Sequence, residues 1–127
     1  MIDALFSQTN YVATKKMLDA TALQQEAIAS NLSNIEKTGY KRLDVDASFI
    51  NELKRAVSAG DSDQILGLKP ALTVDANAVS NTKDGNTVQL EKELMKMNQN
   101  VVSHALETQL VTGQLLRLRL AITGRPN

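Results

Sequence analysis

The residues that could do chemistry in this chain are few and lie far apart in the sequence. His104 is the only histidine and cysteine is absent, so the usual ligand sets for a transition metal cannot be assembled. Four carboxylates have the residue types of a general acid and base, in two pairs: Asp44 with Asp46, and Glu91 with Glu93. Each pair opens a segment of helical spacing, where acidic side chains favour the positive helix start. The sequence therefore predicts no catalytic, cofactor or metal site, and it favours a protein that is not an enzyme.

The composition excludes several classes of partner. In 127 residues, 14 Lys and Arg balance 14 Asp and Glu, so no net charge is available to release counterions from a nucleic acid. An aromatic fraction of 3% leaves almost no platforms for stacking bases. No stretch approaches about 18 uninterrupted apolar residues, and the N-terminus lacks a basic segment followed by an apolar run, so we expect no membrane span and no cleaved secretory signal. A glycine-rich phosphate loop is also missing, and no small-molecule substrate is indicated.

The longest patterned stretch runs from Val88 to Ile122 and predicts a helix. Alternating steps of four and three, counted back from Ile122, pass through a file of mostly apolar residues, which is typical of heptad packing against a partner helix. This file consists of Leu90, Leu94, Met97, Val101, His104, Thr108, Val111, Leu115, Leu118 and Ile122. A second apolar file lies beside it and consists of Val102, Leu106, Leu110, Leu116 and Leu120. Because two files make a wide apolar face, we expect this helix to contact more than one neighbour, with His104 in a structural role.

Signals at both ends bound this helix, which we place over residues 86–123. Asn86 or Thr87 is expected to cap its start, and Gly124 followed by Pro126 is expected to end it. About 35 helical residues span roughly 52 Å. A compact chain of 127 residues is only about 36 Å across, so we expect an elongated molecule.

A second long helix is expected over residues 1–35. Its stripe is rich in alanine, with Met17, Leu23 and Ile28 among the larger members. Small side chains allow another helix to approach closely, while leucine and methionine of the C-terminal helix provide bulk. We therefore expect the two terminal helices to pack as a coiled-coil-like pair within one mainly α domain over residues 1–127.

The middle of the chain is expected to be short and irregular. Residues 36–48 are expected to form a turn and linker. Asn34, at the end of the first helix, and Gly39, in the turn, are the candidates for positive φ. Residues 49–85 then hold three predicted segments. In chain order these are a short helix started by Asp44 or Asp46 and ended by Gly60, an edge strand from Leu66 to Val74, and a flexible loop from Asp75 to Lys83.

Two short motifs carry a resemblance to a known family. The first follows the N-terminal helix and consists of Asn31, Leu32, Asn34, Thr38, Gly39, Tyr40 and Lys41. The second precedes the C-terminal helix and consists of Asp84, Gly85 and Asn86. With these motifs and its small size, the chain resembles the rod proteins of the bacterial flagellar basal body, and among them the proximal rod members. It departs from their pattern at Thr38, where proline is usual, and at His104, where an aromatic residue is usual.

The resemblance implies a structural subunit of the flagellar basal body rod, located in the periplasmic space and exported without a cleaved signal by the flagellar type III apparatus. Its partners would be itself, other rod subunits, and the membrane-ring and adaptor proteins of the basal body. In such proteins the terminal helices assemble side by side into a helical rod that transmits torque, so neighbouring subunits cover the apolar stripes. The predicted assembly interface consists of Leu94, Met97, Val101, Val102, Leu106, Leu110, Val111, Leu115, Leu116, Leu118, Leu120, Met17, Leu23 and Ile28.

Other interpretations fit parts of the pattern. A free-standing helical hairpin would share the heptads but would leave a large apolar patch exposed on the C-terminal helix. A generic coiled-coil adaptor would not need the motif between residues 31 and 41. A secretion chaperone would form a discrete complex with its client, and a small hydrolase would need a reactive pocket. A different position within the rod is also compatible with both motifs.

Overall fold

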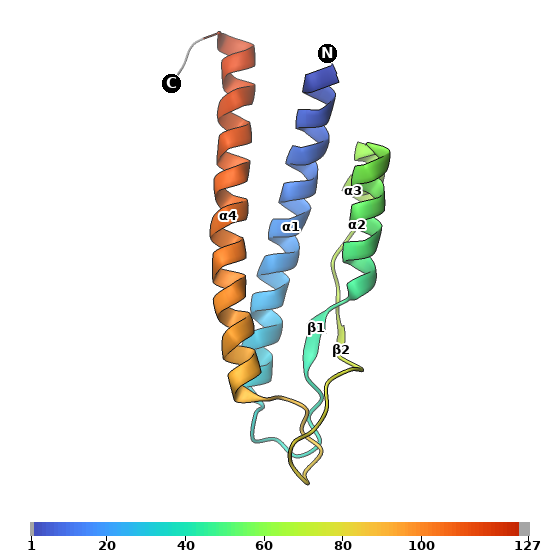
Figure 1. Cartoon of the computed structure of the whole chain (residues 1–127), viewed down its shortest axis with the longest axis vertical. Helices are drawn as coiled ribbons and strands as arrows, with labels where there is room; N and C mark the ends of the chain where they lie inside the picture. Colours follow the sequence, from blue (N-terminus) through green and yellow to red (C-terminus); the bar gives the residue numbers. More distant parts are fainter. Residues whose placement is uncertain (1, 125–127) are drawn as a thin grey trace.

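The computed structural model is elongated and mainly helical, as expected from the sequence (Figure 1). It describes the backbone of residues 2–124 and the side chains of residues 8–124. Two long helices near the ends of the chain are separated in sequence by two shorter helices and a small sheet. In chain order the elements are α1 (Ile2–Ser33), β1 (Leu43–Val45), α2 (Ala47–Ala59), α3 (Ser62–Gly67), β2 (Leu72–Val74) and α4 (Leu90–Thr123).

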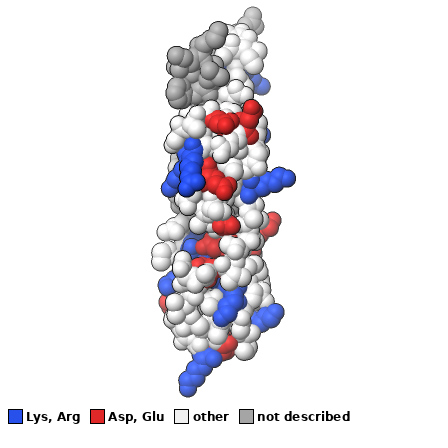
Figure 2. Space-filling model, turned by 90° about the vertical axis from the view of Figure 1, so that its right-hand side faces the viewer, with Lys and Arg blue, Asp and Glu red and all other residues white. Residues whose placement is uncertain are grey.

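Helix α1 occupies the centre of the molecule, with α4 on one side and α2 and α3 on the other (Figure 1). The two long helices run in opposite directions, so the start of α1 and the end of α4 lie at the same end of the molecule. Figure 2 shows acidic and basic side chains interspersed along the side that α2 and α3 form, without a block of one sign. Among the described residues, none of the helices has both the length and the apolar character needed to cross a bilayer.

The hydrophobic core lies between α1 and the two short helices. Its buried members are Val12 and Ala20 of α1, Phe49, Leu53 and Ala56 of α2, and Ile65 of α3. The bulky partners of the alanine-rich face of α1 were expected on α4, but they come from α2 and α3. Helix α2 carries its apolar residues on a single face that can be buried in one contact, whereas most large aliphatic residues of α4 remain exposed.

Local capping explains the bounds of the short helices. The Asp46 carboxylate accepts a hydrogen bond from the Ser48 amide at 3.0 Å, so Asp46 rather than Asp44 caps α2. Gly60 ends α2 at φ 65°, as predicted. Asp61 then caps α3 by accepting from the Gln64 amide at 3.1 Å. Because this cap starts a further helical turn, residue 66 lies in a helix and not in the predicted strand.

The sheet consists of two antiparallel strands in which Leu43 pairs with Val74 and Val45 with Leu72. The predicted edge strand is therefore confirmed only over residues 72–74, and its partner β1 lies in the segment that was expected to be a linker. Both strands are three residues long, too short for an alternating pattern to identify them.

The bounds of α4 differ from expectation only at its start. The helix begins at Leu90, and neither Asn86 nor Thr87 caps it, because both side chains are engaged elsewhere. At the other end Gly124 adopts φ 66° and its amide donates to the Leu120 carbonyl at 2.7 Å, which confirms the predicted stop. Pro126 lies outside the described residues.

Candidate functional site

The first sequence motif forms the turn in which the chain leaves α1. The Lys37 amide donates to the Asn34 carbonyl at 3.0 Å, and the Tyr40 amide donates to the Lys37 carbonyl at 3.2 Å. Gly39 lies at φ 73°, which confirms the prediction for this residue. Asn34 does not adopt positive φ; instead its side-chain amide donates at 2.8 Å to the Ser30 carbonyl, which also accepts from the Asn34 backbone amide at 3.1 Å.

The second motif pairs directly with this turn, although about 45 residues separate the two in the chain. The Gly39 amide donates to the Asp84 carbonyl at 2.8 Å, and the Thr87 amide donates to the Tyr40 carbonyl at 3.0 Å. Lys41 adds a bond from its Nζ to the Gly85 carbonyl at 3.0 Å. The structure thus brings the two motifs together into one unit, which we call the loop joint and define as residues 34–41 with 84–88.

Asn86 is the centre of the loop joint. Its side chain is buried, and its amide nitrogen donates to the carbonyls of Asn34, Ile35 and Lys37 at 2.9, 3.0 and 2.8 Å. Its amide oxygen accepts from the Val88 backbone at 2.8 Å. One side chain therefore satisfies carbonyls just beyond the end of α1 and at the same time shapes the approach to α4.

Tyr40 and Asn31 fasten the loop joint to α1. The Tyr40 hydroxyl lies 3.2 Å from Asn31 Oδ1 and 2.9 Å from Ser30 Oγ. Asn31 is completely buried and also bonds both backbone groups of Leu43, accepting from the amide at 2.8 Å and donating to the carbonyl at 2.9 Å. An apolar residue at position 31 would leave these backbone groups of β1 without partners, which explains why a buried position holds asparagine.

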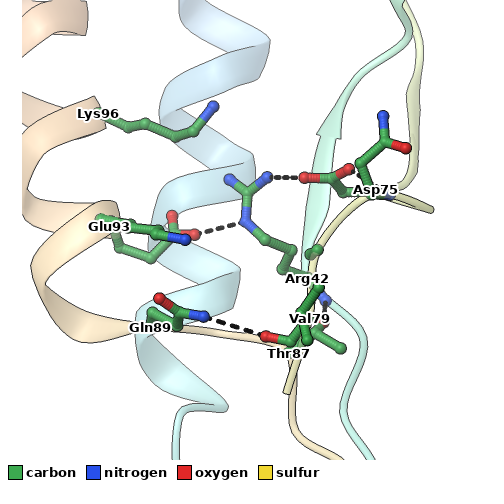
Figure 3. Close-up of a pocket in the computed structure, with 10 residues that line it drawn as sticks. Arg42, Asp75, Val79, Thr87, Gln89, Glu93 and Lys96 are labelled. Atoms are coloured by element: carbon green, nitrogen blue, oxygen red, sulfur yellow. Dashed lines mark hydrogen bonds and ion pairs between the residues drawn. The ribbon is translucent and has the colours of Figure 1, made fainter. Parts of the chain in front are cut away.

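Next to the loop joint, Arg42 connects three separate parts of the chain (Figure 3). Its Nε donates to Glu93 of α4 at 2.6 Å, and its Nη1 donates to Asp75 at 2.6 Å and to Asp44 of β1 at 3.0 Å. Lys96 of α4 also contacts Asp44, at 3.2 Å. These five residues form what we call the Arg42 cluster.

Burial makes the central pair of this cluster energetically important. The side chains of Arg42 and Glu93 are 6% and 0% exposed. Burial by itself would lower the pKa of Arg42, but hydrogen bonds to Glu93, Asp44 and Asp75 raise it above its ordinary value. Burial would likewise raise the pKa of Asp44, but the hydrogen bond from Arg42 and the positive charge of Lys96 hold it below its ordinary value. Arg42 and Asp44 are therefore both charged at neutral pH.

A cavity of about 160 Å³ adjoins the Arg42 cluster, and its lining includes Arg42, Asp75, Glu93 and Lys96 of the cluster together with Thr87 (Figure 3). Every carboxylate of the cluster is already bonded to a cation of the cluster, so none is placed to act as a general base. Within the described part of the chain, no group of three His, Cys, Asp or Glu residues is suited to hold a metal ion. The Arg42 cluster therefore holds together the start of α4, the sheet and the loop that begins at Asp75.

The sequence interpretation missed Arg42, Asp75, Thr87 and Glu93 as members of this region. Glu93 was assigned to the helix start, and Thr87 to the helix cap. The Thr87 hydroxyl instead accepts from the Arg42 amide at 2.8 Å. The available signal was the position of Arg42 directly after the first motif, but its partners Asp75 and Glu93 are 33 and 51 residues away in the chain. Of the predicted motif residues, Thr38 is exposed and Leu32 is half-buried.

The backbone conformation of Gly39 leads to a prediction for the loop joint. Gly39→Ala should destabilise the chain by about 1 kcal/mol or more, because alanine is strained at this φ while its Cβ would meet no atom within 4 Å. Gly113→Ala is the matched control, since this glycine lies within α4 in equally open space and alanine should stabilise the helix by up to about 1 kcal/mol. Urea denaturation of the two variants measures the difference. Equal urea midpoints for Gly39→Ala and Gly113→Ala would show that alanine is tolerated at the backbone conformation of residue 39.

Helix α4 turns polar side chains toward α1. Glu93, Asn100 and Glu107 recur every seven residues and contact α1 through hydrogen bonds. Asn31 donates to Glu93 at 3.3 Å, Asn100 donates to the Thr21 carbonyl at 3.1 Å, and the Thr21 hydroxyl donates to Glu107 at 2.6 Å. The long helices lie side by side as expected. However, each of these three polar residues comes one position before a member of the first predicted file, namely Leu94, Val101 and Thr108.

Consequently most of the predicted assembly residues lie at the surface of the described chain. Those on α4 that are exposed are Leu94, Val101, Val102, Leu106, Leu110, Leu115, Leu116, Leu118 and Leu120. His104 of the same file is also exposed, whereas Met97, Val111, Met17 and Leu23 are half-buried. Ile28, in contrast to the prediction, is completely buried inside the chain and presents no surface to another subunit.

The chain is similar to known proteins along most of its length. No protein-family model matches it. The flagellar basal body rod protein FlgB of Escherichia coli is 25% identical over 131 residues, covering 91% of this chain and 92% of that protein. FlgB of Salmonella typhimurium is 25% identical over 140 residues, covering 98% and 99%. FlgB of Bacillus subtilis is 25% identical over 118 residues, covering 84% and 88%. The resemblance predicted from the two motifs is thereby confirmed, and it is a resemblance to FlgB-type flagellar basal body rod proteins along most of the chain.

Proposed function

We propose that this chain is a structural subunit of the flagellar basal body rod and that neighbouring subunits cover the exposed faces of α4. The observation that carries the proposal is the exposure of both apolar files along α4. Large aliphatic side chains in such number form a patch beyond what a soluble monomer usually exposes. The chain is similar to FlgB proteins over most of its length, and a rod built from many subunits would bury such an apolar face of α4.

The function of such a subunit is mechanical. The chain would be exported without a cleaved signal through the type III apparatus, occupy the rod in the periplasmic space, and transmit torque. Contacts between different surfaces of successive copies extend an assembly, whereas contacts between identical surfaces close it as a dimer. The loop joint and the Arg42 cluster would then serve to keep α1 and α4 in one relative position under load. Catalysis has no part in this proposal.

The proposal is tested by Leu116→Gln combined with Leu120→Gln. Both side chains are at least 40% exposed, so the double variant should change the unfolding free energy of the isolated chain by less than about 1 kcal/mol. In the rod, each change would remove a buried contact worth roughly 1.5 to 3 kcal/mol from every copy of the interface. We expect normal export and a large loss of subunit from purified basal bodies, measured by fractionation.

Val79→Gln is the matched control, because Val79 is an exposed aliphatic residue outside α4. It should leave incorporation unchanged. Normal incorporation of the double leucine variant would mean that this face of α4 remains in water and that the subunit contacts lie elsewhere.

A further inference from the structure

A groove lined by residues of α1, α2 and α4 runs along α1. Helices α2 and α4 lie on opposite sides of α1 (Figure 1). The groove consists of two adjoining cavities of about 930 and about 410 Å³. Met17, Ser103 and Glu107 line both cavities, so the two are continuous. Along α1 the groove extends from Asn10 to Gln24, or about 21 Å of helix. Its length and its three helical walls match the space that a fourth helix occupies in a bundle.

The walls of this groove are mainly apolar. Leu53 and Val57 contribute from α2, and Leu106 and Leu110 contribute from α4. Leu106 and Leu110 are 57% and 48% exposed, so the chain does not cover them by itself. A helix with large aliphatic side chains would remove these surfaces from water, which is the main source of affinity in a helix-in-groove contact.

Two carboxylates line the groove, and Asp44 is paired with Arg42 and Lys96 whereas Glu107 has a different environment. Glu107 is only 7% exposed, and the Thr21 hydroxyl donates to it at 2.6 Å. Within the described residues no cation forms an ion pair with Glu107, although Lys54 lines the same groove from α2. A buried carboxylate without a cation is unfavourable. The groove therefore favours an occupant that combines aliphatic side chains with a basic group.

The last part of α4 has this combination. Between residues 115 and 122 its leucines are exposed, and Arg117 lies among them and is also exposed. We propose that the groove of one copy binds residues 115–122 of α4 from a second copy, with Arg117 facing Glu107. The proposal rests on the proposed rod function and names the surface through which copies join. Each copy then offers a groove and a helix end, which are different surfaces, so the contact is open-ended. In the proposed arrangement the two α4 helices run parallel.

Cysteine cross-linking tests the contact and its direction, because the chain contains no cysteine of its own. Ser58 lines the groove at the end where Asn10 and Gln114 lie, and Asn51 lines it at the end where Gln24 and Asn100 lie. In the parallel arrangement, Ala121 of the second copy approaches the end of the groove at which Ser58 lies. A mixture of Ser58→Cys and Ala121→Cys proteins, mildly oxidised, should therefore form a disulfide-linked dimer.

Asn51→Cys with Ala121→Cys is the matched control. Residues 51 and 58 lie on one face of α2 about 10 Å apart, which exceeds the Cα separation of about 7 Å that a disulfide tolerates. The Ser58 pair should cross-link more strongly than the control, both in concentrated protein and in basal bodies from cells that express both variants. Preferential cross-linking of the Asn51 pair, or no cross-link in either preparation, overturns the proposal.

The charge of Glu107 provides a second measurement. Glu107→Gln keeps an acceptor for the Thr21 hydroxyl, so the thermal midpoint of the isolated chain should stay the same or rise, while cross-linking of the Ser58 pair should fall severalfold. Glu91→Gln, at an exposed carboxylate of the same helix, should leave cross-linking of the Ser58 pair unchanged. Unchanged cross-linking in Glu107→Gln would contradict the pairing with Arg117. Incorporation into basal bodies without the Ser58 cross-link would overturn the groove contact while leaving the rod function intact.

Discussion

Replacing Arg42 with alanine is expected to reduce the free energy of unfolding by about 3 to 5 kcal/mol, the largest loss that we predict for a single truncation in this chain. The reason is the environment of Glu93, whose side chain is 0% exposed and bonded to Arg42 Nε at 2.6 Å. Without the guanidinium, a buried carboxylate loses its cation, and Asp44 and Asp75 lose a shared donor. Since a domain of this size is typically stable by only about 5 to 15 kcal/mol, the loss should be evident in urea denaturation.

Two further variants isolate the cause of this effect. Arg55→Ala removes the same side chain from an exposed position of α2 and should change stability by no more than about 0.5 kcal/mol. Arg42→Met combined with Glu93→Leu removes both charges and should recover most of the loss, because an apolar pair of similar volume avoids the desolvation of two ions. A loss below about 1 kcal/mol in Arg42→Ala would show that water reaches Glu93 and that the cluster contributes little to the free energy of unfolding.

The second large effect is expected at Asn86. In Asn86→Asp the retained oxygen can still accept from the Val88 amide, but the donor to three backbone carbonyls is replaced by a carboxylate. Three acceptors would then face a negative oxygen in a buried site, and we expect a loss of about 3 kcal/mol or more. Asn86→Ala removes the donor without adding a charge. The Asn34 and Lys37 carbonyls keep the amides of Lys37 and Tyr40 as partners and the Ile35 carbonyl loses its donor, so this variant should cost about 1 to 3 kcal/mol.

Asn81→Asp supplies the control, because it makes the same chemical change at an exposed position of the loop that precedes the second motif. Its unfolding free energy should match that of the unmodified chain. Hydrogen exchange should in addition show faster exchange of the Gly39 amide in Asn86→Asp, since the Asp84 carbonyl that it bonds belongs to the same joint. Equal stability of the aspartate and alanine variants would mean that the Asn86 amide is not the donor to these carbonyls.

The loop joint and the Arg42 cluster together hold the start of α4 in place. The loop joint fixes the end of α1 against the segment that enters α4, and the Arg42 cluster then fixes the first turn of α4 against the sheet. Toward the other end of α4, the contacts with α1 are hydrogen bonds such as that between Thr21 and Glu107. The connection between the long helices is therefore tightest at the loop end, and the remaining length of α4 keeps its apolar faces available to other chains.

Local sequence determined the helices and several of their bounds. The spacing of apolar residues identified the terminal helices and α2, Asp46 and Gly60 bounded α2, and Gly39 took the predicted positive φ. The two motifs and the resemblance they carry were also readable, because each depends on neighbouring residues. Periodicity, caps and glycine conformations all act within about one helical turn, so a linear pattern contains them.

Tertiary structure decided what those local features are used for. Asn86 and Thr87 have the chemistry of helix caps, but the carbonyls after α1 and the amide of Arg42 became their partners. The strand β1 exists because β2 pairs with it. Polar residues of α4 bond to α1 through Asn31, Thr21 and their partners, whereas the sequence pattern had indicated only an apolar seam. Each of these outcomes joins residues that are more than 25 positions apart, where the sequence pattern of one segment contains no information on the hydrogen-bonding needs of the other.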